Sequence, residues 1–329
     1  MKRRTWKTKS GLVLAMALTA AAVLAGCGGG SEETTAATTA AETASAAEES
    51  TEAEGTTAAE AGQAEETTAA EAGAEASADI PAPEGDDDTI SIGVTPVPHA
   101  EIVNDVVKGK LEAAGWKVEV VEFNDYVQPN TALEDGELDG NYFQTINYLD
   151  QQNAERGLHL VDVAGIHLEP MGIYANGAAS LEELADGASI AIPNDGSNGS
   201  RALKLLADNG LITLKETEDL YTVMDVEENP HNFEFVELEA ANLPRSLDDV
   251  DAAVINGNYA LEADLNPQTD ALAAEQADGD ESYKYINYLV VKEGNEETVK
   301  TKAMIAAFEN DDVKKYIEDS YSGSVIPAF

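Results

Sequence analysis

Alternating apolar residues mark the start of a folded region near residue 89. Ile90, Ile92 and Val94 occupy every second position of TISIGVTP, which places their side chains on one face of a strand. The apolar residues of the segment 102–111 instead recur at the three- and four-residue spacing of an amphipathic helix. Gly115 ends this segment, and a second alternating run over 118–123 follows it. The pattern therefore predicts a strand, a helix and a second strand.

The same alternation of strands and helices continues to the C-terminus. Further strands are predicted over 141–143, 189–193, 233–238, 252–255 and 285–291, and helices over 131–138, 146–155 and 200–207, with a short capped helix after Ser180 and two helices that meet near Asn310. Strands separated by single helices indicate βαβ units and mainly parallel sheets. About 240 residues of this pattern are more than one sheet usually needs. We therefore expect an α/β fold with two lobes.

The N-terminal residues have the composition of an export signal. Basic residues precede an apolar run over 11–24, which is short for a membrane span, and the run ends in Leu-Ala-Gly-Cys at Cys27. This ending resembles the bacterial lipobox, which implies that residues 1–26 are a signal peptide and that the Cys27 thiol carries lipid. The alternative is a plain secretory signal beside an incidental cysteine. The lipobox interpretation places the protein on the extracytoplasmic face of the cell membrane.

The segment 27–88 consists mainly of Gly, Ser, Thr, Ala and Glu, and it contains no lysine or arginine. Such a segment buries too little apolar surface to offset its ordering entropy, so we expect a disordered tether. The whole chain has a formal net charge of -44, which argues against nucleic acid or an anionic membrane surface as a partner. Its four histidines are scattered along the sequence, so no metal site is predicted.

One arginine stands at a position that favours ligand binding. Arg201 follows the predicted strand 189–193 and a Ser/Asn/Gly-rich loop, so it lies at the carboxyl end of a strand, where open α/β sheets bind ligands. A guanidinium next to helix N-terminal amides is a good receptor for a carboxylate. The alternative is an ordinary surface arginine. The loop lacks the Gly-Lys-Ser/Thr ending of a phosphate-binding loop.

Aromatic and amide side chains follow other predicted strands. Tyr126, Phe143 and Tyr148 could form the wall of a pocket for an apolar side chain, or they could be core residues at strand ends. Asn256 follows a predicted strand and Asn287 interrupts an apolar run, and a buried asparagine needs partners for both its carbonyl and its amide. A zwitterionic ligand could supply such partners, and so could the protein backbone.

The sequence offers little support for catalysis. No GxSxG nucleophile elbow precedes a helix. His99 and Glu101 are two residues apart, a spacing that does not put them on one face of a helix. His167 and Glu169 would share a face of a strand, and we interpret this pair as structural. Neither a catalytic residue nor a cofactor is predicted.

Several motifs together resemble the methionine-binding lipoprotein family (MetQ/NlpA). They are GVTPVPHAEI, FNDYVQPNTALEDGELDGNYFQTINYLDQQ, IPNDGSNGSRALKLL, ELEAANLPRSLDD, AVINGNYA and the segments 226–230 and 285–288, and they follow the order of the family from about residue 89 to residue 329. The resemblance implies a two-lobed periplasmic-binding-protein-like fold with the ligand between the lobes. It implies no enzyme. We place lobe 1 at 89–171 plus 287–329 and lobe 2 at 172–286.

The resemblance also implies a role for each candidate residue. Arg201 would pair with the ligand carboxylate with help from Asn198, and the three aromatic residues would flank the ligand side chain. Asn256 and Asn287 would hold the amino and carboxylate groups. Thr145 stands where the family usually has a histidine that lines the side-chain pocket, so the ligand could differ although its class is kept.

The expected function is delivery of methionine or a close analogue to an ABC permease and its ATPase. The alternatives within the fold are a receptor for a different amino acid or a short peptide, an enzyme of the same two-lobed build, and a surface lipoprotein that no longer transports.

Overall fold

The computed structural model of the chain describes residues 80–217, 220–276 and 282–329. The predicted signal peptide, Cys27 and most of the predicted tether lie outside these residues. All described residues belong to one compact unit. No helix among them is long and apolar enough to cross a membrane.

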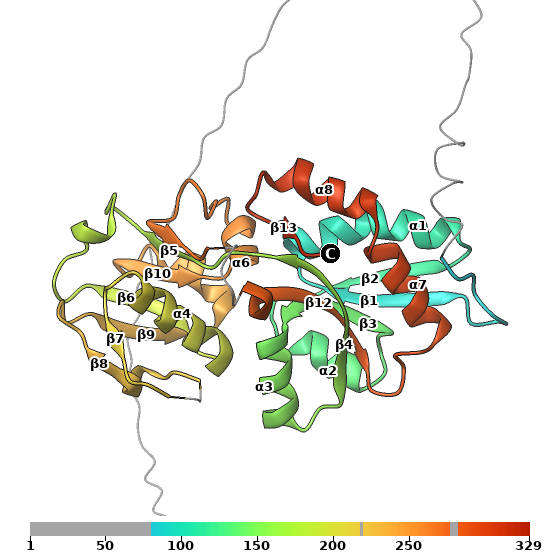
Figure 1. The fold of residues 1–329 in the computed structure, drawn as a ribbon, viewed down its shortest axis with the longest axis horizontal. Coiled ribbons are helices and arrows are strands. Elements are labelled where there is room, and N and C mark those ends of the chain that lie inside the picture. The colour runs from blue at the N-terminus through green and yellow to red at the C-terminus, as the bar shows by residue number, and fades with distance from the viewer. Residues whose placement is uncertain (1–79, 218–219, 277–281) are drawn as a thin grey trace, which may run out of the picture. The chain divides into compact units, whose positions relative to one another are not determined.

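The first lobe is built on a six-stranded sheet with the order β13-β4-β12-β3-β1-β2 (Figure 1). Its strands are β1 (Thr89–Val94), β2 (Lys117–Glu122), β3 (Gly140–Thr145), β4 (Leu160–Leu168), β12 (Ile286–Lys292) and β13 (Ile326–Pro327). One face packs against α1 (Lys108–Ala113), α7 (Val299–Phe308) and α8 (Asp311–Tyr321), and the other against α2 (Gln128–Glu134) and α3 (Ile146–Arg156). Short helical stretches at Pro96–Ala100 and Val103–Val107 lead into α1.

The second lobe is built on a five-stranded sheet with the order β11-β5-β10-β6-β9. Its strands are β5 (Gly172–Ala175), β6 (Ser189–Pro193), β9 (Glu234–Leu238), β10 (Ala252–Ile255) and β11 (Ala273–Ala274), and its helices are α4 (Gly196–Asp208), α5 (Leu243–Ser246) and α6 (Gly257–Glu262). A small separate pair joins β7 (Thr213–Leu214) to β8 (Val226–Glu228), and single short turns lie at Leu181–Glu183, Val223–Asp225, Ala240–Asn242 and Ser282–Tyr285.

Both sheets are mixed, whereas the sequence predicts mainly parallel sheets. In the first sheet β1 is parallel to β2 and β3, but β12 is antiparallel to β3 and β4. In the second sheet β6 is parallel to β9 and β10, but β5 is antiparallel to β10 and β11. The reason is topological, because the chain leaves the first sheet after β4, continues directly into β5, and returns to the first sheet as β12 (Figure 1).

Several predicted elements occur with shifted ends. The helix predicted to begin at Ser200 begins at Gly196, because Asp195 caps it by accepting a hydrogen bond from the backbone amide of Asn198 at 2.8 Å. Arg201 therefore lies within α4 rather than at its start. The capping box predicted at Ser180 is absent, since Glu183 accepts from the backbone amide of Ala179 instead. The nine-residue strand β4 was not predicted as an element.

The folded part begins earlier than the sequence indicates. Ile80 is buried in the core of the first lobe, and the indole of Trp116 donates a hydrogen bond to the carbonyl of Pro81 at 2.8 Å. Lys300 also forms an ion pair with Asp87 at 2.9 Å. The prediction that the tether extends to residue 88 is therefore wrong for its last nine residues. The single isoleucine and the prolines at this end give the segment apolar surface that the preceding residues lack.

Candidate functional site

The eight residues predicted to bind a ligand line a single cavity. They come from distant parts of the sequence and from both lobes: Tyr126, Phe143, Thr145, Tyr148, Asn198, Arg201, Asn256 and Asn287. Four further residues that the sequence did not indicate as ligand contacts complete the lining: Gln144, Glu169, Gly257 and Asn258. The structure thus brings all eight side chains together, while their contact with a ligand stays a prediction.

Three aromatic rings form the wall that the first lobe contributes. The ring centroid of Tyr126 lies 5.8 Å from that of Phe143 and 5.6 Å from that of Tyr148. These spacings are typical of tilted and edge-on aromatic pairs. Phe143 faces the cavity because residues alternate along β3, so the preceding Tyr142 points to the opposite face and packs in the core. The aromatic residues therefore divide between the two roles that the sequence left open.

Arg201 is buried and makes several charged and polar contacts. Its Nε and Nη2 atoms donate to the two carboxylate oxygens of Glu275 at 2.8 and 2.5 Å, and Nη2 also donates to the backbone carbonyl of Glu169 at 2.9 Å. The guanidinium also lies 4.2 Å from the ring centre of Tyr285. Burial disfavours the charged form, but Glu275, together with Tyr285 and Glu169, outweighs it and raises the pKa of Arg201. The contacts described here do not use Nη1.

Hydrogen bonds fix the side chains of Asn198 and Asn256 in the second lobe and leave one polar atom of Asn256 without a partner. Asn198 donates through its side chain to both carboxylate oxygens of Asp195, and its Oδ1 accepts from Nδ2 of Asn256 at 2.8 Å. With its amide fixed in this way, Asn256 has a buried Oδ1 without a hydrogen-bond partner. An unpaired buried carbonyl carries a free-energy penalty of about 1–3 kcal/mol, which a ligand that donates a hydrogen bond would remove.

Asn258 presents the opposite chemistry and was missed at the sequence level. Its Oδ1 accepts a hydrogen bond from the hydroxyl of Tyr126 at 2.5 Å, and its Nδ2 is buried without a partner. Asn256 thus leaves an acceptor free and Asn258 leaves a donor free, and both residues line the same cavity. The only sequence signal was the recurrence of asparagine in Asn256-Gly257-Asn258, directly after a strand.

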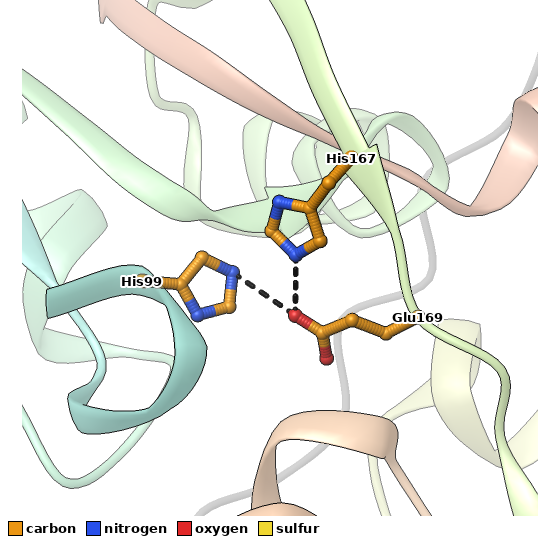
Figure 2. Close-up of side chains that lie close together, drawn as sticks. All are labelled: His99, His167 and Glu169. Atoms are coloured by element: carbon orange, nitrogen blue, oxygen red, sulfur yellow. Dashed lines mark hydrogen bonds and ion pairs between the residues drawn. The ribbon is translucent and has the colours of Figure 1, made fainter. Parts of the chain in front are cut away.

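Glu169 was interpreted as structural, yet its buried side chain lines the cavity. Figure 2 shows Nε2 of His167 and Nε2 of His99 pointing at the same carboxylate oxygen, at 2.6 and 3.4 Å. Nε2 of His99 also lies 3.2 Å from Oδ1 of Asn287. The alternation of β4 places His167 and Glu169 on one side, as the sequence indicated, but the cluster depends on His99 from a distant turn.

This cluster contains three groups that commonly bind metals, with ligand atoms within 4.8 Å of one another. Two ligands on a tetrahedral zinc ion with bonds of about 2.0–2.1 Å lie roughly 3.3 Å apart. Nε2 of His167 and Oε1 of Glu169 are 2.6 Å apart, which is a hydrogen-bond distance. The arrangement of these two atoms is therefore that of a hydrogen bond.

Two α/β lobes with a cavity lined by aromatic, amide and charged side chains are typical of a substrate-binding protein. A family model described as NlpA lipoprotein matches residues 90–329. The chain belongs to the NlpA lipoprotein family. As the sequence predicts, it is a transporter's substrate-binding protein and not an enzyme.

Relatives and solved structures agree with this assignment. The D-methionine-binding lipoprotein MetQ of Escherichia coli K12 is 40% identical over 246 residues, which cover 74% of this chain and 89% of the relative. The crystal structure of a lipoprotein from Ruminococcus gnavus is 48% identical with a TM-score of 0.72, covering 74% of this chain and 100% of that one. A nutrient binding protein from Burkholderia cenocepacia, bound to methionine, is 42% identical with a TM-score of 0.69, covering 73% and 100%.

Proposed function

We infer that the chain is the methionine receptor of an ABC importer and that lipid on Cys27 holds it to the extracytoplasmic face of the cell membrane. Relatives named for methionine binding and a similar structure bound to methionine support the ligand. The observation that carries the proposal is the pair of buried, unpartnered amide atoms beside Arg201, namely Oδ1 of Asn256 and Nδ2 of Asn258. An α-amino acid offers a donor to the first and an acceptor to the second.

Each end of such a ligand has a complementary group in the cavity. The carboxylate pairs with Nη1 of Arg201 and with Nδ2 of Asn258, while the ammonium donates to Oδ1 of Asn256. Asn198 acts through Asn256 rather than by direct contact, because its own side chain is engaged by Asp195 and Asn256. The side chain of methionine lies against the aromatic wall, which provides apolar and sulfur–aromatic contacts.

Transport requires the permease and its ATPase to recognise the loaded receptor. A ligand that contacts both lobes favours the conformation in which the lobes enclose it, and the permease binds that conformation better. One alternative is a different ligand, either another amino acid or a short peptide, which Thr145 favours because it is smaller than histidine. The other is a surface lipoprotein that serves no transporter.

The ligand is tested on gently purified full-length protein. Mass spectrometry of the small molecules released on denaturation should detect methionine or a close analogue. Calorimetry and thermal unfolding with L- and D-methionine, other amino acids and short peptides should then give the largest rise in melting temperature with methionine, by mass action. A clear shift with an unrelated amino acid and none with methionine would keep the class and reject this ligand.

The lipid anchor is tested by Cys27→Ala. The variant should appear in the soluble fraction instead of the membrane fraction, because the acyl chains that hold the protein are lost. Cys27→Ser serves as a second variant of the same thiol. If both variants stay with the membrane after a high-salt wash, the lipobox interpretation is wrong.

A further inference from the structure

Glu169 places a buried carboxylate in the cavity without an ion pair to a lysine or arginine among the described residues. Its ion-pair contacts are those with His99 and His167. Arg201 hydrogen-bonds only the backbone carbonyl of Glu169 and is ion-paired with the carboxylate of Glu275, so its charge acts on the Glu169 carboxylate from a distance. A buried ion without a partner is costly, so this carboxylate needs either neutral donors or a cation from outside.

His167 is a neutral donor to Glu169, whereas Nε2 of His99 donates to Oδ1 of Asn287 at 3.2 Å and lies 3.4 Å from the Glu169 carboxylate. An ionised carboxylate can only accept, so we assign the ring proton of each histidine to Nε2. In His167, Nδ1 then accepts a hydrogen bond from the hydroxyl of Tyr142. In His99, Nδ1 accepts one from Oγ1 of Thr95 at 2.8 Å. Burial lowers the pKa of His167 to about 3 and that of His99 to about 4. Neither imidazole therefore carries a positive charge near neutral pH.

The local packing holds the carboxylate at the edge of the cavity. A Cβ atom on Gly257 would lie 2.7 Å from Cβ and 3.1 Å from Oε2 of Glu169. Only glycine allows the first turn of α6 to approach so closely, and Asn256 and Asn258 flank that glycine. The carboxylate and the unpartnered Oδ1 of Asn256 therefore belong to the same part of the cavity lining.

The geometry points to Glu169 as the counter-charge for the ligand's ammonium group, with His99 and His167 as positioning residues that hold its carboxylate. This assignment rests on the proposed function and deepens it, because it makes a positively charged α-ammonium a requirement for tight binding. Asn256 supplies a hydrogen bond to the ammonium, and Glu169 supplies the charge. The aromatic wall has no part in this requirement.

Charged and titratable groups around Glu169 determine how binding depends on pH. They are His99, His167, Arg201 with Glu275, and the hydroxyls of Tyr126 and Tyr142. Burial raises the pKa of Glu169, partly opposed by His99, Arg201 and a backbone amide. An ammonium ion favours the ionised form, so ligand binding lowers this pKa again and releases a proton. Affinity for methionine therefore falls as the pH is lowered through the raised pKa of the free protein.

The test compares methionine with its 2-hydroxy analogue, in which a hydroxyl replaces the ammonium. Calorimetry measures both ligands with the wild-type protein and with Glu169→Gln, which keeps the shape and removes the charge. We expect Glu169→Gln to weaken methionine binding about 30-fold or more and hydroxy-analogue binding about 3-fold or less. The pH dependence of methionine binding should also flatten. Equal weakening of both ligands, or no weakening, would overturn the assignment.

Two histidine variants test the positioning role independently. His167→Gln keeps an N–H donor for Glu169 and should retain most of the preference for methionine over the hydroxy analogue. His167→Leu removes the donor and should reduce that preference, whereas a purely structural role would lower both affinities together. Thermal unfolding checks that each variant folds. If the wild-type protein binds neither ligand but binds another amino acid, the proposed ligand is wrong, and that amino acid and its 2-hydroxy analogue give the same test of Glu169.

Discussion

The two walls of the cavity differ in chemistry. The first lobe contributes the rings of Tyr126, Phe143 and Tyr148, while the second contributes the guanidinium of Arg201 and the amides of Asn256 and Asn258. The groups on the second lobe suit the ends that all α-amino acids share, and the rings suit the part in which they differ. Selection among side chains is thus assigned to the first lobe, and recognition of ligand class mainly to the second, with Glu169 after β4 and Asn287 on β12 as the contributions of the first lobe to it.

This division makes closure depend on the whole ligand. A ligand that has only the α-carboxylate and α-ammonium groups contacts mainly the second lobe. A ligand that has only the apolar side chain contacts mainly the first. The two lobes already meet at several hydrogen bonds, among them those from the hydroxyl of Tyr126 to Asn258 and from Arg201 to the carbonyl of Glu169. Substitutions on each wall should therefore give different ligand profiles, and the following variants are ordered by expected effect.

Arg201→Ala should have the largest effect, weakening binding of every amino acid by ~2–5 kcal/mol, because the ligand carboxylate loses its charged partner in a desolvated site. Calorimetry on folded protein measures this loss. The substitution also leaves Glu275 buried and unpaired, so the double variant Arg201→Ala with Glu275→Gln serves as the control. Near-native affinity in both variants would remove Arg201 from the site.

Tyr148→Ala should weaken methionine binding by about 1–3 kcal/mol, because the ligand side chain loses an aromatic contact. Unlike the loss at Arg201, this one should depend on side-chain length. Affinities measured for 2-aminobutyrate, norvaline and norleucine should differ less in the variant than in the wild type. A loss of the same size for all three ligands would contradict the assignment of selectivity to the aromatic wall.

Tyr126→Phe separates the two functions within one residue. The ring stays in the wall, but the hydroxyl that holds Asn258 is lost, so we expect a loss of about 0.5–1.5 kcal/mol that is similar for all amino acids. Competition binding against methionine with the same series of ligands measures the profile. A change in the order of preference would show that the hydroxyl takes part in side-chain selection.

Thr145→His should have the smallest effect on methionine, within about 1 kcal/mol, and binding should be as good or better. The three aromatic rings provide most of the apolar contact, and the substitution restores the residue that is usual in the family. Thermal shift with a panel of amino acids measures the outcome, with Thr145→Val as a matched control that removes the hydroxyl. Markedly weaker methionine binding by Thr145→His would indicate a pocket adapted to another side chain.

The sequence predicted the elements of the fold better than their pairing. Local pattern identified β1 by its alternating apolar residues, and β6, β10 and β12 by short, mainly apolar runs. It did not identify β4, whose apolar pattern is broken by Asp162 and Gly165. The mixed sheets could not be read from local pattern, because they follow from a chain that passes from one sheet to the other.

Five candidate residues were identified because aromatic or polar side chains follow predicted strands: Tyr126, Phe143, Tyr148, Arg201 and Asn256. Asn287 was identified because it interrupts an apolar run, and Asn198 and Thr145 only through the resemblance to the family. Asn258 and Glu169 were missed for two different physical reasons. The start of α6 at Gly257 determines where Asn258 lies, and helix ends are poorly fixed by sequence. Glu169 could not be recognised from its own segment, because the tertiary fold brings His99, which is distant in the sequence, close to its carboxylate.

The packing of Ile80 and Pro81 on the first lobe has a practical consequence for where the protein can be shortened. A soluble version that starts at Thr89 would remove Ile80 from the core and leave the indole N–H of Trp116 without its acceptor. A version that starts before Ile80 keeps both contacts. A soluble version of the protein should therefore start in the predicted tether before Ile80, and not at the first strand.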